Sequence, residues 1–149
     1  LKQDIKERRS KMTQLFRIAE DAGICVEYCR LPLNESISAP DKDGDFILMD
    51  YSLLWAAASE RVHFAHELGH CLTGSFYNAY SAFNVRQKYE NRADKWAVKK
   101  LIPKDELEEA VQSGMKTSWE LAEYFGVTED FMKKAVCYYT NGNLAVEYF

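Results

Sequence analysis

The 149-residue sequence contains little of what flexible, fibrous or membrane-embedded chains are made of. Only seven glycines and three prolines are present, which leaves little material for linkers, low-complexity segments or a collagen-like repeat. The longest fully apolar run covers residues 53–58, far short of the roughly 20 residues that a membrane-spanning helix needs. With 47% hydrophobic and 28% charged residues, the composition is typical of a single globular domain.

The chain also has no excess of positively charged residues. The formal net charge is −4, whereas domains whose main task is to hold nucleic acid are generally basic. The charge therefore argues against direct nucleic-acid binding as the function of this chain.

The four cysteines do not form a metal-binding pattern. Cys25 and Cys29 are separated by three residues, but no second pair of Cys or His residues accompanies them, as a zinc ribbon requires. The first residues include no apolar stretch of the kind found in signal peptides. We therefore expect reduced cysteines and a cytoplasmic location.

Residue patterning predicts an α+β chain in which helices form the majority. An amphipathic pattern predicts a helix over residues 1–22, and β-branched and aromatic residues predict strands at 24–29 and 46–49. A short strand around Ile37 could pair with the second of these as a hairpin. From residue 52 onward the pattern is helical. The predicted helices span residues 52–58, 59–73, 86–101, 104–113, 117–125 and 128–139.

The pattern H-E-x-x-H falls inside the predicted helix 59–73. His66 and His70 are four residues apart and lie one helical turn apart, so both imidazoles can bind one Zn²⁺ ion. Glu67 projects about 100° further round the helix. From there it can reach a water on the open side of the ion and take its proton. His63 lies about 10.5 Å from His70 along the helix axis, too far to share the ion with it, so we expect a packed or surface histidine.

A catalytic zinc needs a third protein ligand, and the next helix offers two carboxylates. Glu90 and Asp94 are four residues apart on the predicted helix 86–101, beside Ala93, whose small side chain allows close approach. We assign Glu90 as the third ligand and expect Asp94, one turn deeper, to accept the other ring N–H of a ligand histidine. Gly69 costs a helix about 1 kcal/mol relative to alanine and so indicates a packing requirement.

Three blocks of the sequence occur in an order that is typical of one family. They are RVHFAHELGHCL at 61–72, ENRADKWA at 90–97 and Leu-Ile-Pro at 101–103. In these blocks the chain resembles the ImmA/IrrE family of zinc metallopeptidases. The likeness extends over roughly residues 15–140. The resemblance implies a zincin-like domain in which Glu90 is the third zinc ligand and Glu67 the general base.

The resemblance also implies a substrate class. In phages and other mobile genetic elements, such peptidases are encoded beside a helix-turn-helix repressor and cleave it. We therefore expect a zinc endopeptidase with one Zn²⁺ per chain and a protein substrate of this kind. The alternative is a catalytically silent zinc-containing module that regulates a repressor by protein contact.

The expected organisation is one metallopeptidase domain over residues 1–149. Its zincin-like core would span 1–115, with a small sheet near the N-terminus and active-site helices at 59–73 and 86–101. A helical subdomain would follow at 116–149.

That subdomain has the pattern of a helix-turn-helix, with Ala122 in its first helix and Gly126 in its turn. DNA binding is one interpretation, and a two-helix packing unit is the other. Glu129 and Asp130 open the second helix, where they would repel phosphate and where Arg or Lys usually read bases. We expect a packing unit that holds a partner protein or forms a wall of the cleft.

Several further side chains flank the predicted site. One of Tyr77, Tyr80 and Tyr89 could donate a hydrogen bond to the oxyanion of the reaction, or the three could be core residues. Cys71 follows His70 directly and is expected to be a small buried hydrophobe.

Overall fold

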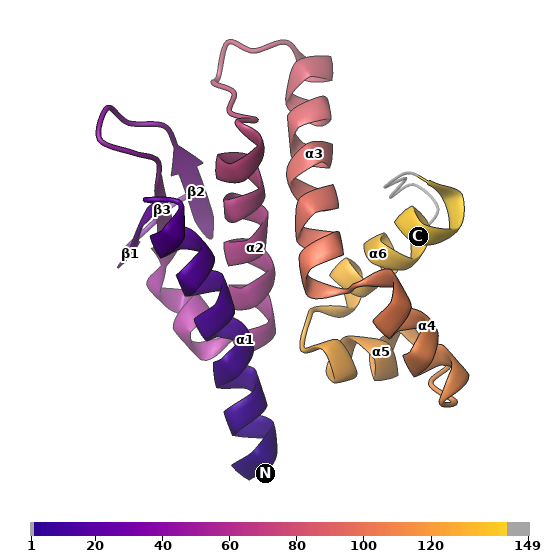
Figure 1. Ribbon diagram of the computed structural model, residues 1–149. Helices are drawn as coiled ribbons and strands as arrows, with labels where there is room; N and C mark the ends of the chain where they lie inside the picture. The colour runs from indigo at the N-terminus through magenta and orange to yellow at the C-terminus, as the bar shows by residue number, and fades with distance from the viewer. Residues whose placement is uncertain (1, 143–149) are drawn as a thin grey trace.

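A computed structural model describes residues 2–142 of the chain, with side chains at Lys6 and from Ser10 onward. These residues form an α+β structure of six α-helices, a short 3₁₀ helix and three strands (Figure 1). In chain order the elements are α1 (Lys2–Asp21), β1 (Cys25–Cys29), β2 (Ser36–Ala39), β3 (Phe46–Asp50), η1 (Tyr51–Trp55), α2 (Ala57–Thr73), α3 (Phe83–Leu101), α4 (Lys104–Gln112), α5 (Ser118–Phe125) and α6 (Glu129–Asn141).

The three strands form one small sheet in the order β1-β3-β2. β1 runs parallel to β3, and β2 runs antiparallel to it. Along β3, Ile47 and Met49 are fully buried while their neighbours are partly exposed, as expected for a strand with one face on the core. Both predicted strands and the short hairpin strand around Ile37 are confirmed.

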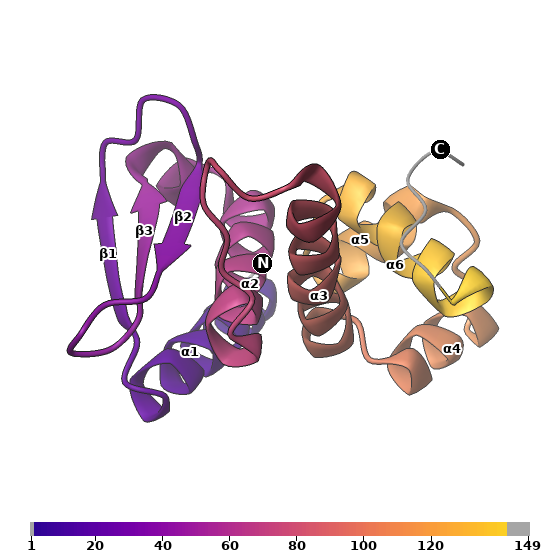
Figure 2. The same cartoon turned by 90° about the horizontal axis from the view of Figure 1, so that it is seen from above.

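The elements lie in layers, which Figure 2 shows from above: the sheet, then α2, then α3, then the group α4–α6. α2 is the central element, because it packs against β2 and β3 on one side and against α3 on the other. α1 packs against α2 and β1. The side chains between these layers are fully buried at Phe64 and Leu68 of α2 and at Ala97 and Val98 of α3.

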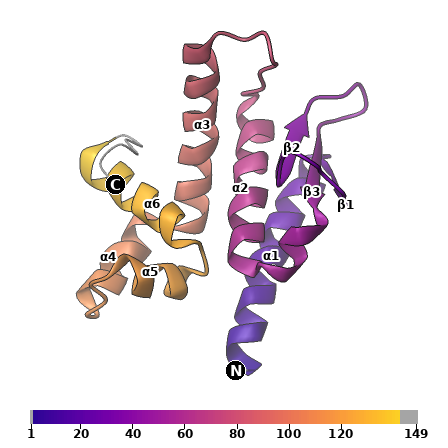
Figure 3. The ribbon, with the colours of Figure 1, turned by 180° about the vertical axis from the view of Figure 1, so that it is seen from behind.

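α2 and α3 approach each other closely where Gly69 faces Ala93. A Cβ atom at Gly69 would lie 2.6 Å from the carbonyl oxygen of Ala93 and 2.9 Å from its Cα, closer than atoms can pack. The packing requirement that the sequence indicated for this glycine is therefore present. The view from behind shows the two helices again side by side (Figure 3).

One predicted helix is wrong. Residues 52–58 do not form a helix of their own: η1 covers Tyr51–Trp55, and α2 already begins at Ala57. The cause lies at both ends of η1, where the Asp50 carboxylate accepts the backbone N–H of Ser52 and Ala56 has an extended φ of −133°. The helix predicted over 86–101 also begins three residues earlier, at Phe83.

α5 and α6 pack as a two-helix unit that is attached to α2. Their facing side chains are buried, among them Phe125, Phe131 and Met132. The turn between them contains Gly126 in the left-handed region, with φ of 67°. The buried Arg61 guanidinium of α2 donates to the carbonyl oxygens of Phe125 and Gly126, which fixes this turn against the core.

None of the helices within residues 2–142 combines the length and the apolar composition that crossing a membrane requires.

Replacing Gly69 by Ala should destabilise the protein, although alanine is the better helix former. Helix propensity alone would stabilise the variant by about 1 kcal/mol, whereas forcing a methyl group onto the Ala93 backbone should cost about 1–3 kcal/mol. Chemical denaturation of Gly69→Ala measures the sign. Leu72→Ala, at an exposed position of the same helix, should change stability by less than about 0.5 kcal/mol. A Gly69→Ala protein that is more stable than the wild type would refute the close contact.

Candidate metal centre

Three side chains from α2 and α3 bring their potential ligand atoms together. Nε2 of His66 lies 3.0 Å from Oε2 of Glu90, and Nε2 of His70 lies 3.1 Å from Oε1 of the same carboxylate. The two Nε2 atoms are 3.1 Å apart. Within the described residues these three side chains form the group whose geometry could hold a metal ion. Two imidazoles and a carboxylate are a donor set found in catalytic metal sites, so the residues fit such an ion.

The other ring nitrogen of each histidine is occupied by a protein acceptor. Nδ1 of His66 donates to Oδ1 of Asp94 at 2.7 Å, and Nδ1 of His70 donates to the carbonyl oxygen of Ser75 at 2.7 Å. Both contacts fix the tautomer that leaves Nε2 free to bind a metal. The sequence predicted the Asp94 contact but not the Ser75 contact, for which the only signal is Gly74. This glycine ends α2 in the left-handed conformation and turns the chain back.

Asp94 has a second partner that sequence reasoning missed. Nζ of Lys134, on α6, lies 2.8 Å from Oδ2 of Asp94. The contact joins residues 40 positions apart, and no local pattern in the sequence could have predicted it. The same carboxylate therefore joins a candidate ligand histidine to the two-helix unit.

Glu67 does not belong to the metal-binding group and points instead toward β2. The residue is 6% exposed, and its carboxylate accepts hydrogen bonds from the hydroxyls of Ser36 at 2.8 Å and Ser38 at 2.5 Å. His63 also lies outside the group, as predicted. It is partly exposed and contacts Ser36 and Glu35. Sequence reasoning missed both serines.

The three tyrosines that flank the predicted site differ in their exposure and contacts. The Tyr77 hydroxyl donates to Oε1 of Glu90 at 2.6 Å, and its side chain remains 41% exposed. Tyr80 is almost fully exposed, and Tyr89 has the guanidinium of Arg92 over its ring at 5.4 Å. The core interpretation is therefore wrong for Tyr77 and Tyr80. Cys71 is buried, as expected for a small hydrophobe.

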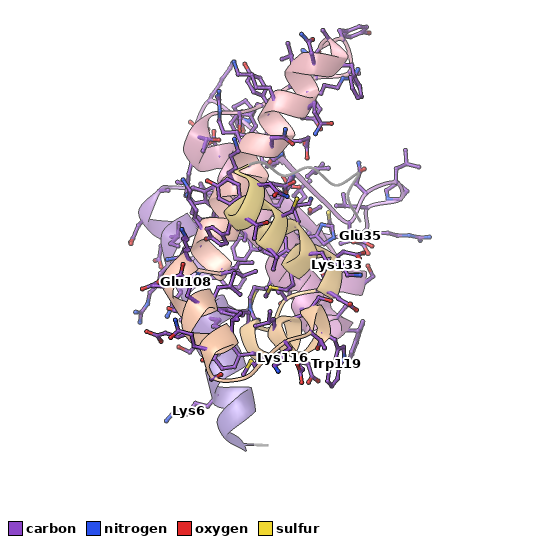
Figure 4. The ribbon with its side chains drawn as sticks, turned by 90° about the vertical axis from the view of Figure 1, so that its right-hand side faces the viewer. Lys6, Glu35, Glu108, Lys116, Trp119 and Lys133 are labelled. Carbon is purple, nitrogen blue, oxygen red and sulfur yellow. The ribbon has the colours of Figure 1, made fainter. Side chains whose placement is uncertain are left out.

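These groups open into a cleft of about 960 Å³. Its walls come from α2 and α3, from the segment that leads into β2, and from α6. The α6 wall confirms that the two-helix unit borders the cleft. Glu35, just before β2, and Lys133 of α6 both line the cleft and are labelled close together in Figure 4. The other lining residues used below are Ser36, Ser38, His63, His66, Glu67, His70, Tyr77, Glu90, Asp94 and Lys134.

The charges of the metal-free site stabilise one another. Burial would lower the pKa of His66, but the hydrogen bonds to Asp94 and Glu90 and the charges of both carboxylates raise it from 6.5 to about 10. Burial would raise the pKa of Glu90, yet hydrogen bonds from His66, His70 and Tyr77 lower it well below its usual range. The pKa of Asp94 is lowered as well, because its contacts with His66 and Lys134 outweigh its burial. The two carboxylates therefore stabilise positive charge at His66.

Comparison with known protein families finds one family model that matches the chain. The family model Peptidase_M78, described as the IrrE N-terminal-like domain, matches residues 19–136. The match covers well over half of the chain and includes every residue of the candidate site. A search of curated proteins finds no match.

In chelator-treated protein, stability should fall as the pH rises from 6.5 to 10. A histidine whose pKa is raised by folding contributes stability that is complete below its unfolded pKa and is lost as the pH passes its folded pKa. For His66 that interval runs from 6.5 to about 10. Asp94→Asn removes one of the two carboxylates that raise this pKa, so its stability should fall less steeply over the interval. Denaturation at a series of pH values measures both slopes.

The exposed Asp43 in the turn before β3 provides the matched control. Asp43→Asn should follow the wild-type curve in parallel. Parallel curves for wild type and Asp94→Asn would contradict the assigned cause of the His66 shift.

Proposed function

This chain belongs to the IrrE N-terminal-like (Peptidase_M78) family of peptidases, and we propose that it is a zinc-dependent endopeptidase that cleaves a specific intracellular regulatory protein. The single observation that carries the proposal is the convergence of His66, His70 and Glu90 on one point between α2 and α3. Glu67 faces the same cleft. The family match also confirms the resemblance that the sequence motifs indicated.

In this proposal His66, His70 and Glu90 hold one zinc ion per chain. A zinc ion in such a donor set polarises the carbonyl of a scissile peptide bond and lowers the pKa of water toward 7. Asp94 and the Ser75 carbonyl hold the two imidazole rings by Nδ1, so that each Nε2 would be available to a metal ion. The Tyr77 hydroxyl holds Glu90 from the cleft side.

Glu67 is the proposed general base. Its carboxylate takes a proton from the attacking water and then gives the same proton to the nitrogen of the leaving amine. Its burial supports this role, because a carboxylate shielded from bulk water transfers its proton within the site. Asp94 is not placed for this role, because its carboxylate contacts Nδ1 of His66, the ring nitrogen on the far side from Nε2, and is held there by Lys134.

The proposed substrate is a helix-turn-helix repressor of a phage or mobile element, encoded beside the peptidase and cleaved in the cytoplasm. The sequence resemblance supports this substrate class. The cleft supports a peptide substrate, because its volume of about 960 Å³ lies at the upper end of the roughly 300–1,000 Å³ of small-molecule sites. The alternative, a silent module that only binds a repressor, predicts the same metal and the same partner but no product.

Purified protein should contain one zinc ion per chain, and Glu90→Ala should lose most of it. Removing one of three protein ligands leaves the metal with two imidazoles, too few for a stable catalytic site. Elemental analysis measures the zinc content of both proteins. Glu106→Ala, which removes an exposed glutamate of α4, should keep the full zinc content. Equal zinc content in Glu90→Ala and the wild type would overturn the assigned ligand set.

Glu67→Gln should keep its zinc and lose cleavage of the neighbouring repressor. Glutamine has nearly the same shape as glutamate but cannot accept a proton at neutral pH, so the loss should be about 10²–10⁴-fold. Gel electrophoresis of the repressor after incubation with each variant measures the product. Glu109→Gln, at an exposed position of α4, should cleave like the wild type. A zinc-loaded wild type that binds the repressor without shortening it would favour the silent module instead.

A further inference from the structure

We propose that two serines of β2, together with His63 and Glu35, form a clamp that positions the carboxylate of Glu67; this inference rests on the proposed peptidase function. Ser36, Ser38, His63 and Glu35 are called the Glu67 clamp below. In these terms Glu67 is the catalytic residue and the members of the clamp are positioning residues, because they act through it.

The inner part of the clamp holds both oxygens of the carboxylate. The Ser36 hydroxyl donates to Oε1 at 2.8 Å, and the Ser38 hydroxyl donates to Oε2 at 2.5 Å. Two donors on two different oxygens fix the rotation of a carboxylate as well as its position. Glu67 lies on α2 and the serines lie on β2, so the clamp joins two separate elements across the cleft.

The strand itself makes the clamp rigid. Ser36 and Ser38 are two residues apart on a strand, so their side chains lie on the same face of the sheet. Their register is fixed by β3, where they pair with Met49 and Ile47, two fully buried residues. A shift of β2 by one residue would turn both hydroxyls to the other face of the sheet, away from Glu67.

The outer part of the clamp holds the oxygen of Ser36 in place. Nδ1 of His63 lies 3.1 Å from the Ser36 hydroxyl, and Nε2 of His63 lies 2.5 Å from the Glu35 carboxylate. The imidazole is thus held between Glu35 and Ser36. Through these contacts His63 fixes the position of the Ser36 oxygen, which donates its proton to Oε1 of Glu67.

Alanine and threonine variants test the inner part of the clamp in zinc-loaded protein. Ser36→Ala and Ser38→Ala should each lower kcat by about tenfold with KM unchanged, a fraction of what a positioned base contributes. Ser36→Thr and Ser38→Thr keep the hydroxyl and should recover most of the loss. Ser118→Ala removes a serine-to-glutamate hydrogen bond of the same 2.8 Å length on the exposed side of α5 and should leave kcat unchanged.

A double-mutant cycle tests the outer part. His63→Ala should lower kcat by about threefold, because it acts only through Ser36. Combined with Ser36→Ala it should cause no further loss, whereas combined with Ser38→Ala the two losses should multiply. If His63→Ala acted through a general loss of structure, it would lower kcat equally in the Ser36→Ala and Ser38→Ala backgrounds. Zinc content, measured on every variant, should stay at one ion per chain.

A readout that needs no substrate separates this inference from the proposed function. In zinc-loaded protein with ¹³C-labelled glutamate side chains, the Glu67 carboxyl resonance is the one that Glu67→Gln removes. At constant pH it should shift in Ser36→Ala, Ser38→Ala and His63→Ala but not in Ser118→Ala. If the wild type cleaves no repressor while these shifts are seen, the clamp stands and the proposed function fails. An unshifted Glu67 resonance in both serine variants, or an unchanged kcat in an active enzyme, would overturn the clamp.

Discussion

The close contact of α2 with α3 at Gly69 and Ala93 is the constraint on which the site depends. The candidate ligands His66 and His70 lie on α2 on either side of Gly69, and Glu90 lies on α3 one turn before Ala93. Because backbone meets backbone at this point, the side chains just beside it span a short gap, and their ligand atoms lie about 3 Å apart. A larger residue at position 69 would separate the helices, and with them the three donors.

The second constraint is that the polar groups next to these donors have specific partners. Each imidazole donates from Nδ1 to a fixed acceptor, Asp94 or the Ser75 carbonyl, and Glu67 accepts from two hydroxyls. Buried polar groups are stable only when they are hydrogen-bonded, so each of these contacts removes a rotamer in which the site would be incomplete. The arrangement of the site is thus set before any ligand arrives.

Features that depend on residues close together in the sequence could be predicted from it. Helical spacing placed His66 beside His70 and Glu90 beside Asp94, and the glycine in the motif indicated a close contact. Contacts between distant segments could not be derived this way. Ser36 and Ser38 reach Glu67 across about 30 positions, and their role depends on the register of β2 with β3. The separate helix expected over 52–58 is absent for a local reason instead. Asp50 caps η1, and the backbone of Ala56 has non-helical angles, which interrupts the helix that the apolar pattern favours.

The two-helix unit α5–α6 has the spacing of a helix-turn-helix, but α6 differs in its exposed and buried side chains from a helix that reads DNA. In a helix-turn-helix that reads DNA, the second helix presents basic and polar side chains to the groove. In α6 the apolar side chains Phe131 and Met132 are buried against the rest of the chain, and Lys134 points inward to Asp94. Its first turn carries Glu129 and Asp130, which suit the positive end of a helix dipole and repel phosphate. The spacing of small and apolar residues therefore reflects how two short helices pack, and the Lys134 contact places this helix at the wall of the cleft beside the candidate metal centre.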